Sequence, residues 1–70
     1  MLYKNVVRLC EKRGITIAKL EKETGLGNAT VRGWEKATPN FRTLSAVASY
    51  FGVSVDDLMH KDMVADQKSD

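Results

Sequence analysis

Apolar residues recur along this chain at the alternating three- and four-residue spacing of amphipathic helices. The clearest stripes are Tyr3, Val6, Val7 and Cys10 near the start, and Leu44, Val47, Ala48 and Phe51 further on. This spacing places the apolar side chains on one face of a helix. Gly14, Gly25 and Gly52 follow expected helices, and glycine commonly ends a helix because it adopts left-handed backbone without strain. The pattern therefore predicts short helices separated by tight turns.

Polar residues with short side chains precede three of the expected helices. Thr16, Asn40 and Ser54 each stand where a side-chain oxygen accepts a hydrogen bond from the first helical turn. Asp57 follows Ser54 by three residues, which is the spacing of a capping box. These residues predict where the second, fourth and fifth helices begin.

A third helix is expected over roughly residues 28–36, with Val31 and Trp34 facing inward. Pro39 disfavours helical backbone at the residue before it, and so separates this helix from the fourth. No stretch of the sequence has the period-two pattern of a strand. Five short helices with short connections predict a compact all-α domain.

The length of the chain limits its organisation. Seventy residues accommodate one small domain, which we expect over residues 1–62, followed by a short acidic tail over residues 63–70. The first residues carry charges every few positions, unlike a signal peptide or a membrane span. Cys10 is the single cysteine, so no disulfide can form within the chain, and this usage suits the reducing cytoplasm. We therefore expect a cytoplasmic protein.

The net charge of +2 hides an uneven distribution. Residues 1–55 hold nine lysines and arginines against four glutamates, whereas residues 56–70 hold two lysines against five aspartates. A basic body favours a polyanionic partner. The alternative is an ordinary solvated surface, and charge by itself leaves both interpretations open.

The stretch TGLGNATVRGWEK, residues 24–36, contains three glycines but is not a nucleotide-binding fingerprint. Thr30 stands where the third glycine of that motif belongs, and no strand is expected before it. His60 and Cys10 are each single, whereas a metal site needs about three or four ligands. No set of residues suited to nucleophilic catalysis is present. We therefore expect neither an enzyme nor a bound metal or cofactor.

The segment over residues 16–36 predicts two short helices that meet at a tight turn containing Gly25. Gly27 is a candidate cap for the second of these helices. A helix-turn-helix has this organisation, and its second helix lies in the major groove of DNA. A generic pair of packed helices remains the alternative at this level.

The strings GITIAKL, TGLGNATVRGWEK and TPNFRTLSAVASYFGVSVDDLM, with their order and spacing, make a specific resemblance. The chain resembles the Cro/CI-type (XRE) helix-turn-helix family, the lambda-repressor-like DNA-binding domains, over about residues 4–60. The resemblance implies a five-helix domain that binds double-stranded operator DNA in the major groove and regulates transcription. It further implies a symmetric dimer on a near-palindromic site.

Matching the family's motif residue by residue assigns two sets of DNA contacts. The positions that reach base edges fall on Asn28, Ala29, Arg32 and Gly33. The candidate phosphate contacts are Thr16, Lys19, Thr30, Lys36, Thr38, Asn40, Arg42 and Thr43. One alternative remains at the start of the third helix: Asn28 caps the helix instead of reading a base. The backbone amides of the same helix start can also hold a phosphate.

The chain departs from the family's pattern at three positions. Ile17 stands where a phosphate-binding glutamine is usual, so one common contact is missing. Glu21 stands where the two helices cross and a small alanine is usual, so its carboxylate must tilt outward or find a hydrogen-bond donor. Cys10 stands where many members have an arginine that pairs with the acidic residue at Glu35.

The resemblance leads to two functional hypotheses. The first is a transcriptional repressor of phage or mobile-element type. Its self-contact is expected to be a weak homodimer, strengthened by DNA, formed by Met59, Met63 and Val64. The second hypothesis is a protein-interaction module of antitoxin or antirepressor type, because the expected base-reading set includes two residues with little or no side chain.

Overall fold

A computed structural model describes residues 2–61 of the chain. Its elements, in chain order, are α1 (Leu2–Arg13), α2 (Ile17–Thr24), the 3₁₀ helix η1 (Val31–Glu35), α3 (Phe41–Phe51) and α4 (Val55–His60). The described residues contain no strand, so the all-α prediction is confirmed. The expectation of five α-helices needs a correction, because residues 2–61 contain four and the third predicted helix is a short 3₁₀ segment. The predicted tail over 63–70 lies outside the described residues.

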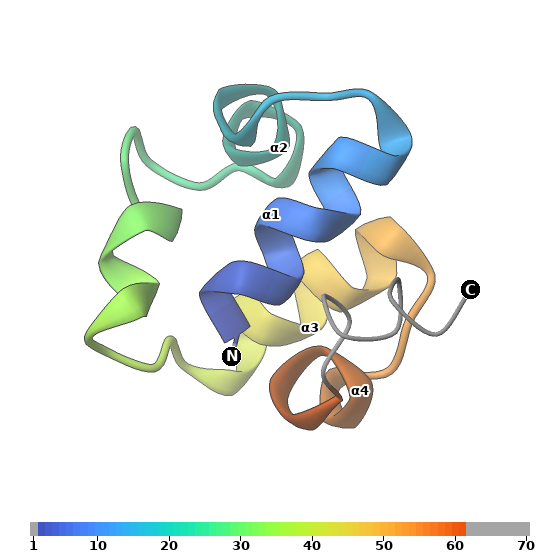
Figure 1. Cartoon of the computed structure of the whole chain (residues 1–70). Helices are drawn as coiled ribbons and strands as arrows, with labels where there is room; N and C mark the ends of the chain where they lie inside the picture. The colour runs from blue at the N-terminus through green and yellow to red at the C-terminus, as the bar shows by residue number, and fades with distance from the viewer. Residues whose placement is uncertain (1, 62–70) are drawn as a thin grey trace.

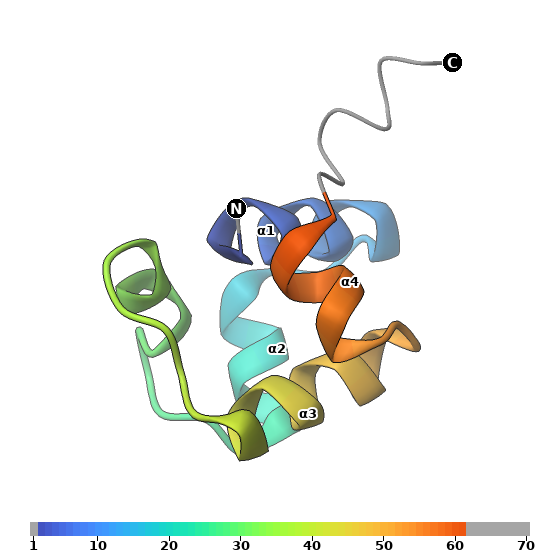
Figure 2. The same ribbon diagram turned by 90° about the horizontal axis from the view of Figure 1, so that it is seen from below.

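The helix α1 is the centre of the arrangement. In Figure 1 it crosses the molecule with α2 on one side and α4 on the other. It contacts both of these helices and η1, while α3 contacts α2 and α4. The view in Figure 2 shows η1, in green, standing at one edge of the molecule, away from α4. The segment from the end of α2 to η1 is therefore exposed along much of its length.

The core contains side chains from all five elements. Its buried members are Leu2, Val6, Cys10, Leu20, Val31, Trp34, Leu44, Val47, Ala48, Phe51 and Leu58. All four residues of the second predicted stripe are buried, and so are the two residues predicted to face inward from η1. Of the first predicted stripe, Val6 and Cys10 are buried, whereas Tyr3 and Val7 are half-buried. The predicted face of the later helix is therefore confirmed, and that of α1 is confirmed in part.

The predicted helix boundaries rest on capping bonds that the structure contains. Thr16 Oγ1 accepts from the Lys19 amide at 3.1 Å, and Asn40 Oδ1 accepts from the Thr43 amide at 2.9 Å. Ser54 Oγ accepts from the amide of Asp57 at 3.0 Å. The three helix-ending glycines all have positive φ angles, between 72° and 77°. These predicted caps are confirmed.

Asn5 is a buried polar residue that the apolar pattern does not reveal. Its side chain is fully buried, and its Nδ2 donates to the carbonyl of Leu58 at 2.8 Å and to that of Lys61 at 2.6 Å. Both carbonyls lie at the end of α4, where a helix leaves its last carbonyls to be bonded from outside. Asn5 thus joins α1 to the end of a six-residue helix.

Replacing Asn5 by alanine is expected to lower the free energy of unfolding by about 1–3 kcal/mol, because the carbonyl of the buried Leu58 would lose its donor. Urea unfolding followed by circular dichroism measures this change. Lys4→Ala is the control, since Lys4 is an exposed neighbour on α1. A loss for Asn5→Ala of only about 0.5 kcal/mol, as is usual for surface changes, would contradict the capping role.

Candidate nucleic-acid interface

The residues between α2 and the end of η1 form the predicted DNA-reading part of the chain. We call residues 28–35 the reading segment. Gly25 ends α2 with φ 77°, and the Leu26 amide donates to the Glu21 carbonyl at 2.8 Å. Leu26 is half-buried and packs against the core. The turn therefore carries the chain away from α2 and leads it toward the edge of the molecule.

The reading segment starts differently from the prediction. The helix expected over residues 28–36 begins only at Val31, and its N-cap residue is Thr30, whose side chain makes no capping bond. Asn28 is therefore not the helix cap, and Gly27 does not cap it either. Ala29 has φ 64°, the only positive φ among the described residues other than glycine. This left-handed residue breaks the helical path before η1 begins.

Glu21 supplies the missing cap from α2. Its Oε2 accepts from the Val31 amide at 2.9 Å, and its Oε1 accepts from the Ala29 amide at 3.2 Å. The residue is buried, with 4% of its surface exposed. A buried carboxylate is costly without hydrogen-bond donors. The prediction that Glu21 needs a donor is confirmed, and the donors are the amides of the reading segment.

These bonds also concern the prediction that backbone amides at the start of the third helix hold a phosphate. The amides of Ala29 and Val31 donate to Glu21, and the Thr30 amide donates to the Gly27 carbonyl at 3.2 Å. All three amides already have partners within the chain. These three amides are therefore engaged within the chain, and the prediction that backbone amides at this helix start hold a phosphate stays untested.

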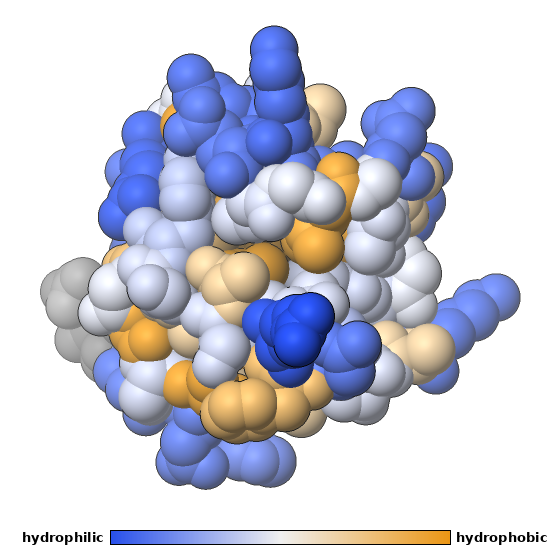
Figure 3. Space-filling view, turned by 180° about the vertical axis from the view of Figure 1, so that it is seen from behind, coloured by the Kyte–Doolittle hydropathy of each residue, from blue (hydrophilic) through white to orange (hydrophobic). Residues whose placement is uncertain are grey.

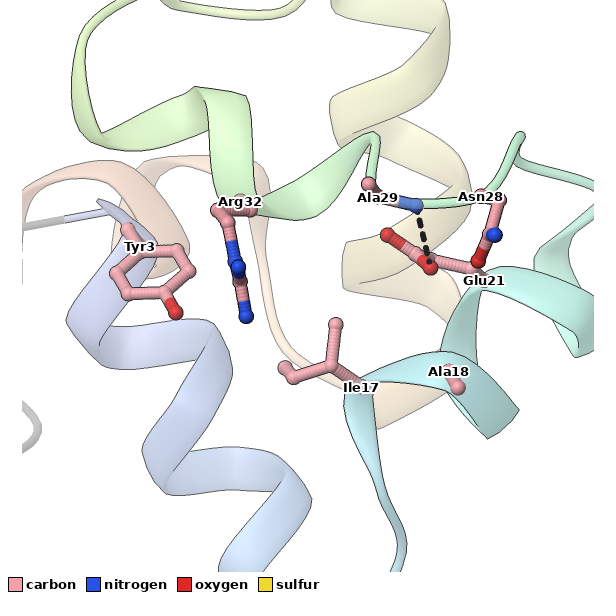
Figure 4. A pocket seen from close by; sticks show the side chains of 7 residues that line it. All are labelled: Tyr3, Ile17, Ala18, Glu21, Asn28, Ala29 and Arg32. Atoms are coloured by element: carbon pink, nitrogen blue, oxygen red, sulfur yellow. Dashed lines mark hydrogen bonds between the residues drawn. The ribbon is translucent and has the colours of Figure 1, made fainter.

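A pocket of about 290 Å³ lies between α1, the start of α2 and the reading segment. Its lining residues, drawn in Figure 4, are Tyr3, Ile17, Ala18, Glu21, Asn28, Ala29 and Arg32. Three of the four residues assigned to base contacts thus line one pocket. Gly33 does not line it and is exposed, and an added Cβ there would meet no atom within 4 Å.

Arg32 reaches from η1 into this pocket. Figure 4 shows its side chain pointing between Tyr3 of α1 and Ile17 of α2. Arg32 is exposed, so its guanidinium remains accessible from solvent. A guanidinium in such a place offers a planar set of donors suited to a guanine edge or a phosphate.

The residues assigned to phosphate contacts are mostly exposed. Thr16, Lys19, Lys36, Thr38, Asn40 and Arg42 are exposed, whereas Thr30 and Thr43 are half-buried. Thr16 and Asn40 use an oxygen for capping. Capping leaves the hydroxyl proton of the first and the amide NH₂ of the second as donors. Both residues therefore combine a structural bond with a group that suits a phosphate.

The cations near the reading segment keep their charge unneutralised. Within residues 2–61, Lys19, Arg32, Lys36 and Arg42 make no ion pair of 4 Å or less. Arg13 differs, because its guanidinium donates to the Tyr50 carbonyl at 2.8 Å and lies over two aromatic rings. Arg13 therefore joins α1 to α3, and the other four cations remain available to an anionic partner.

Cys10 lies in the hydrophobic core, and His60 lies on the surface. Cys10 is buried in the core, and this burial raises the pKa of its thiol above the usual value. His60 is exposed at the end of α4, with Nε2 3.9 Å from an Asp56 carboxylate oxygen. Among residues 2–61, no group of three or more metal-type ligands occurs, and no helix is long and apolar enough to cross a membrane.

The residues assigned to dimer contacts fall only partly within the described structure. Met59 is half-buried and packs against the core, so only part of its side chain is accessible. Met63 and Val64 lie outside the described residues. On the face drawn in Figure 3, hydrophobic residues lie in patches interrupted by hydrophilic side chains. Phe41 is the exposed large hydrophobic residue of the described part, at 70% exposure.

Comparison with known protein families gives a match that covers most of the chain. The model of the Cro/C1-type HTH DNA-binding domain matches residues 5–61. No curated protein and no solved structure shows a significant match. The matched range includes α2, the turn, the reading segment and both following helices.

Proposed function

Because the chain belongs to the Cro/C1-type HTH DNA-binding domain family, we propose that it recognises a specific duplex sequence and represses transcription. In this proposal, the protein is a cytoplasmic regulator of phage or mobile-element type. The observation that carries this proposal is the exposed edge of the molecule where Asn28 and Arg32 line one pocket beside unpaired cations. The proposal includes no enzymatic activity, metal or cofactor.

Base recognition is assigned to the reading segment. The Asn28 side chain makes no bond to another described residue, and its amide suits the paired donor and acceptor of adenine. Arg32 suits the two acceptors of guanine, and the Ala29 methyl suits the methyl group of thymine. Gly33 has no side chain to read a base, so its proposed contribution is a close approach of the backbone to the duplex.

Phosphate contacts are assigned to the residues on either side of this segment. Lys19 on α2, Lys36 after η1 and Arg42 on α3 supply positive charge, and the neutral candidates are Thr16, Thr30, Thr38, Asn40 and Thr43. Contacts to phosphates fix the orientation of a protein on the duplex but carry no sequence information themselves. In the proposed interface, one set of residues thus positions the protein on the phosphates, and the reading segment recognises the bases.

Two-fold symmetry is part of the proposal, because one reading segment spans only a few base pairs. Family-type repressors overcome this by placing two copies about 34 Å apart, one turn of DNA, on a near-palindromic site. We assign the self-contact to the accessible part of Met59 together with Met63 and Val64. Such a patch is small against the roughly 1,200–2,000 Å² of a stable interface, so the dimer is weak without DNA.

Selection of bound sequences from random duplex DNA tests the proposal. The expected result is a near-palindromic consensus that binds two protomers, counted by sedimentation with and without the selected duplex. Asn28→Ala should then lose preference at one base-pair position, by about 1–3 kcal/mol, whereas Lys36→Ala should weaken all sequences about equally. Unchanged sequence preference in Asn28→Ala would remove this residue from the reading set, and one protomer per site would remove the dimer.

One observation favours a second candidate, the antitoxin- or antirepressor-like protein-interaction module. Phe41 is 70% exposed at the start of α3, beside Arg42. Exposed aromatic residues are typical anchors of protein interfaces. Failure of the selection to yield any preferred duplex, even at low salt, would favour this candidate over the DNA regulator.

A further inference from the structure

We propose that Glu21 is a positioning residue for DNA recognition, which holds the reading segment in the conformation that presents Asn28 and Arg32. This inference rests on the proposed function, and it adds a specificity-determining residue that does not itself touch the duplex. Glu21 lies on α2, eight and ten residues before the two amides that it accepts from.

The two hydrogen bonds of Glu21 compensate for the weak structure of the reading segment. The 3₁₀ helix η1 has five residues, and its N-cap residue provides no side-chain cap. Short 3₁₀ helices have poorer hydrogen-bond geometry than α-helices and persist only in short pieces. Charge-assisted bonds from a carboxylate to backbone amides are stronger than neutral ones. The cap that stabilises this helix therefore comes from α2.

Glu21 also holds a backbone conformation that alanine avoids. The left-handed conformation, adopted here at Ala29 with φ 64°, is unfavourable for an L-residue because Cβ comes too close to the following carbonyl oxygen. The amide of this residue donates to Glu21 Oε1. The chain direction therefore changes at Ala29, and Glu21 fixes that change between Asn28 and η1.

Glu21 is buried, so its proposed effect on DNA recognition does not come from touching the duplex. It is 4% exposed, and each of its carboxylate oxygens accepts from an amide of the reading segment. Figure 4 shows its side chain reaching from α2 toward Ala29, at the wall of the pocket that Asn28 and Arg32 also line. Its negative charge is directed toward the chain's own backbone, and it acts through the residues on either side of these amides.

Two variants separate positioning from stability. Glu21→Gln retains the size of the side chain but replaces one acceptor oxygen by an NH₂ group, which cannot accept from an amide. Glu21→Met removes both bonds and the buried charge but keeps a similar side-chain volume, and it leaves the two amides without an acceptor. Its overall stability is therefore measured alongside. Glu23→Gln is the matched control, with the same charge change on the exposed side of α2. The Tyr50 hydroxyl donates to Glu23 Oε1 at 3.4 Å, and the side-chain oxygen of a glutamine can accept the same bond.

Amide hydrogen exchange, measured without DNA, reports how strongly Glu21 protects the two amides that donate to it. In Glu21→Met, both the Ala29 amide and the Val31 amide are expected to exchange about tenfold faster or more, because a bond to a charged acceptor contributes about 1.5–3 kcal/mol. In Glu21→Gln, one of these two amides is expected to show this increase, because the remaining amide oxygen still accepts from the other. The Leu44 amide, which donates to the Asn40 carbonyl of another helix start, should be unaffected. Glu23→Gln should match the wild type at all of these amides.

Binding to duplex DNA measures the consequence for reading. The probes are the duplex selected by the wild-type protein and a scrambled duplex of the same composition. Both Glu21 variants are expected to reduce the ratio of the two affinities about tenfold or more, the effect of losing one base-specific pair. Glu23→Gln should keep the ratio, since it changes the charge but not the reading segment.

The inference is overturned by a Glu21→Met protein that keeps both the wild-type affinity ratio and the wild-type exchange at Ala29 and Val31. It is also overturned if the ratio falls only in proportion to a loss of overall stability, measured by urea unfolding of the same samples. A wild-type protein without any duplex preference instead contradicts the proposed function. The exchange measurement remains informative in that case, because it requires no DNA.

Discussion

Raising the salt concentration from about 50 to about 200 mM is expected to weaken binding to the selected duplex about 40-fold for each bound protomer. The reason is that Lys19, Lys36 and Arg42, the three cations assigned to phosphates, are exposed and make no ion pair within residues 2–61. Each cation that neutralises a phosphate releases counterions and contributes about −0.9 to the slope of log affinity against log salt concentration. Three contacts give a slope of about −2.7, which corresponds to this loss.

Equilibrium binding at several salt concentrations measures the slope, and two variants assign it. Lys36→Gln should make the slope shallower by about 0.9, because one phosphate contact is lost. Lys12→Gln is the control, since Lys12 is exposed near the end of α1 and is not assigned to the interface. A flat salt dependence would contradict the phosphate contacts and would favour the protein-interaction module.

Replacing Leu20 by alanine is expected to lower the free energy of unfolding by about 2–5 kcal/mol, the usual range for such a cavity in a core. Leu20 has no exposed surface and lies on α2, next to Glu21. A domain of this size rarely has more than about 3–5 kcal/mol of stability from a single core. The variant should therefore be largely unfolded at room temperature, which urea and thermal unfolding would show.

Lys22→Ala is the matched control for this experiment, because Lys22 is an exposed residue of the same helix. Its unfolding free energy should stay within about 0.5 kcal/mol of the wild type. A Leu20→Ala protein with wild-type stability would mean that α2 is not held to the core by this side chain. The arrangement of α2 against α1 and α3 would then need another explanation.

Much of the fold follows from local sequence features. The capping residues Thr16, Asn40 and Ser54 define where α2, α3 and α4 begin, and the glycines Gly25 and Gly52 define where α2 and α3 end. The apolar periodicity selects the buried faces, because burial of apolar surface favours one face of each helix. The resemblance to the helix-turn-helix family follows from the same residues, and the family comparison confirms it.

The site could be predicted less completely. The sequence indicates that the residues after Gly25 form the reading part, but the helix predicted over 28–36 is a 3₁₀ segment over Val31–Glu35. Local propensity does not reveal this difference, because its cause is the left-handed Ala29 and the side chain of Glu21 on another helix. The sequence also offers Asn28 as a helix cap, because local propensity does not show that η1 begins later and that its amides donate to Glu21.

Contacts between distant residues were decided only by the tertiary structure. Asn5 bonds to the Leu58 carbonyl 53 positions further along the chain, and Arg13 bonds to the Tyr50 carbonyl 37 positions along. Helical periodicity reports which face of a helix is buried, but it does not report which polar group of a remote element lies opposite. The sequence by itself therefore determines the four α-helices of the described residues and most of the apolar side chains in the core. The tertiary structure determines the partners of the buried polar groups, and through Glu21 it determines the shape of the reading segment.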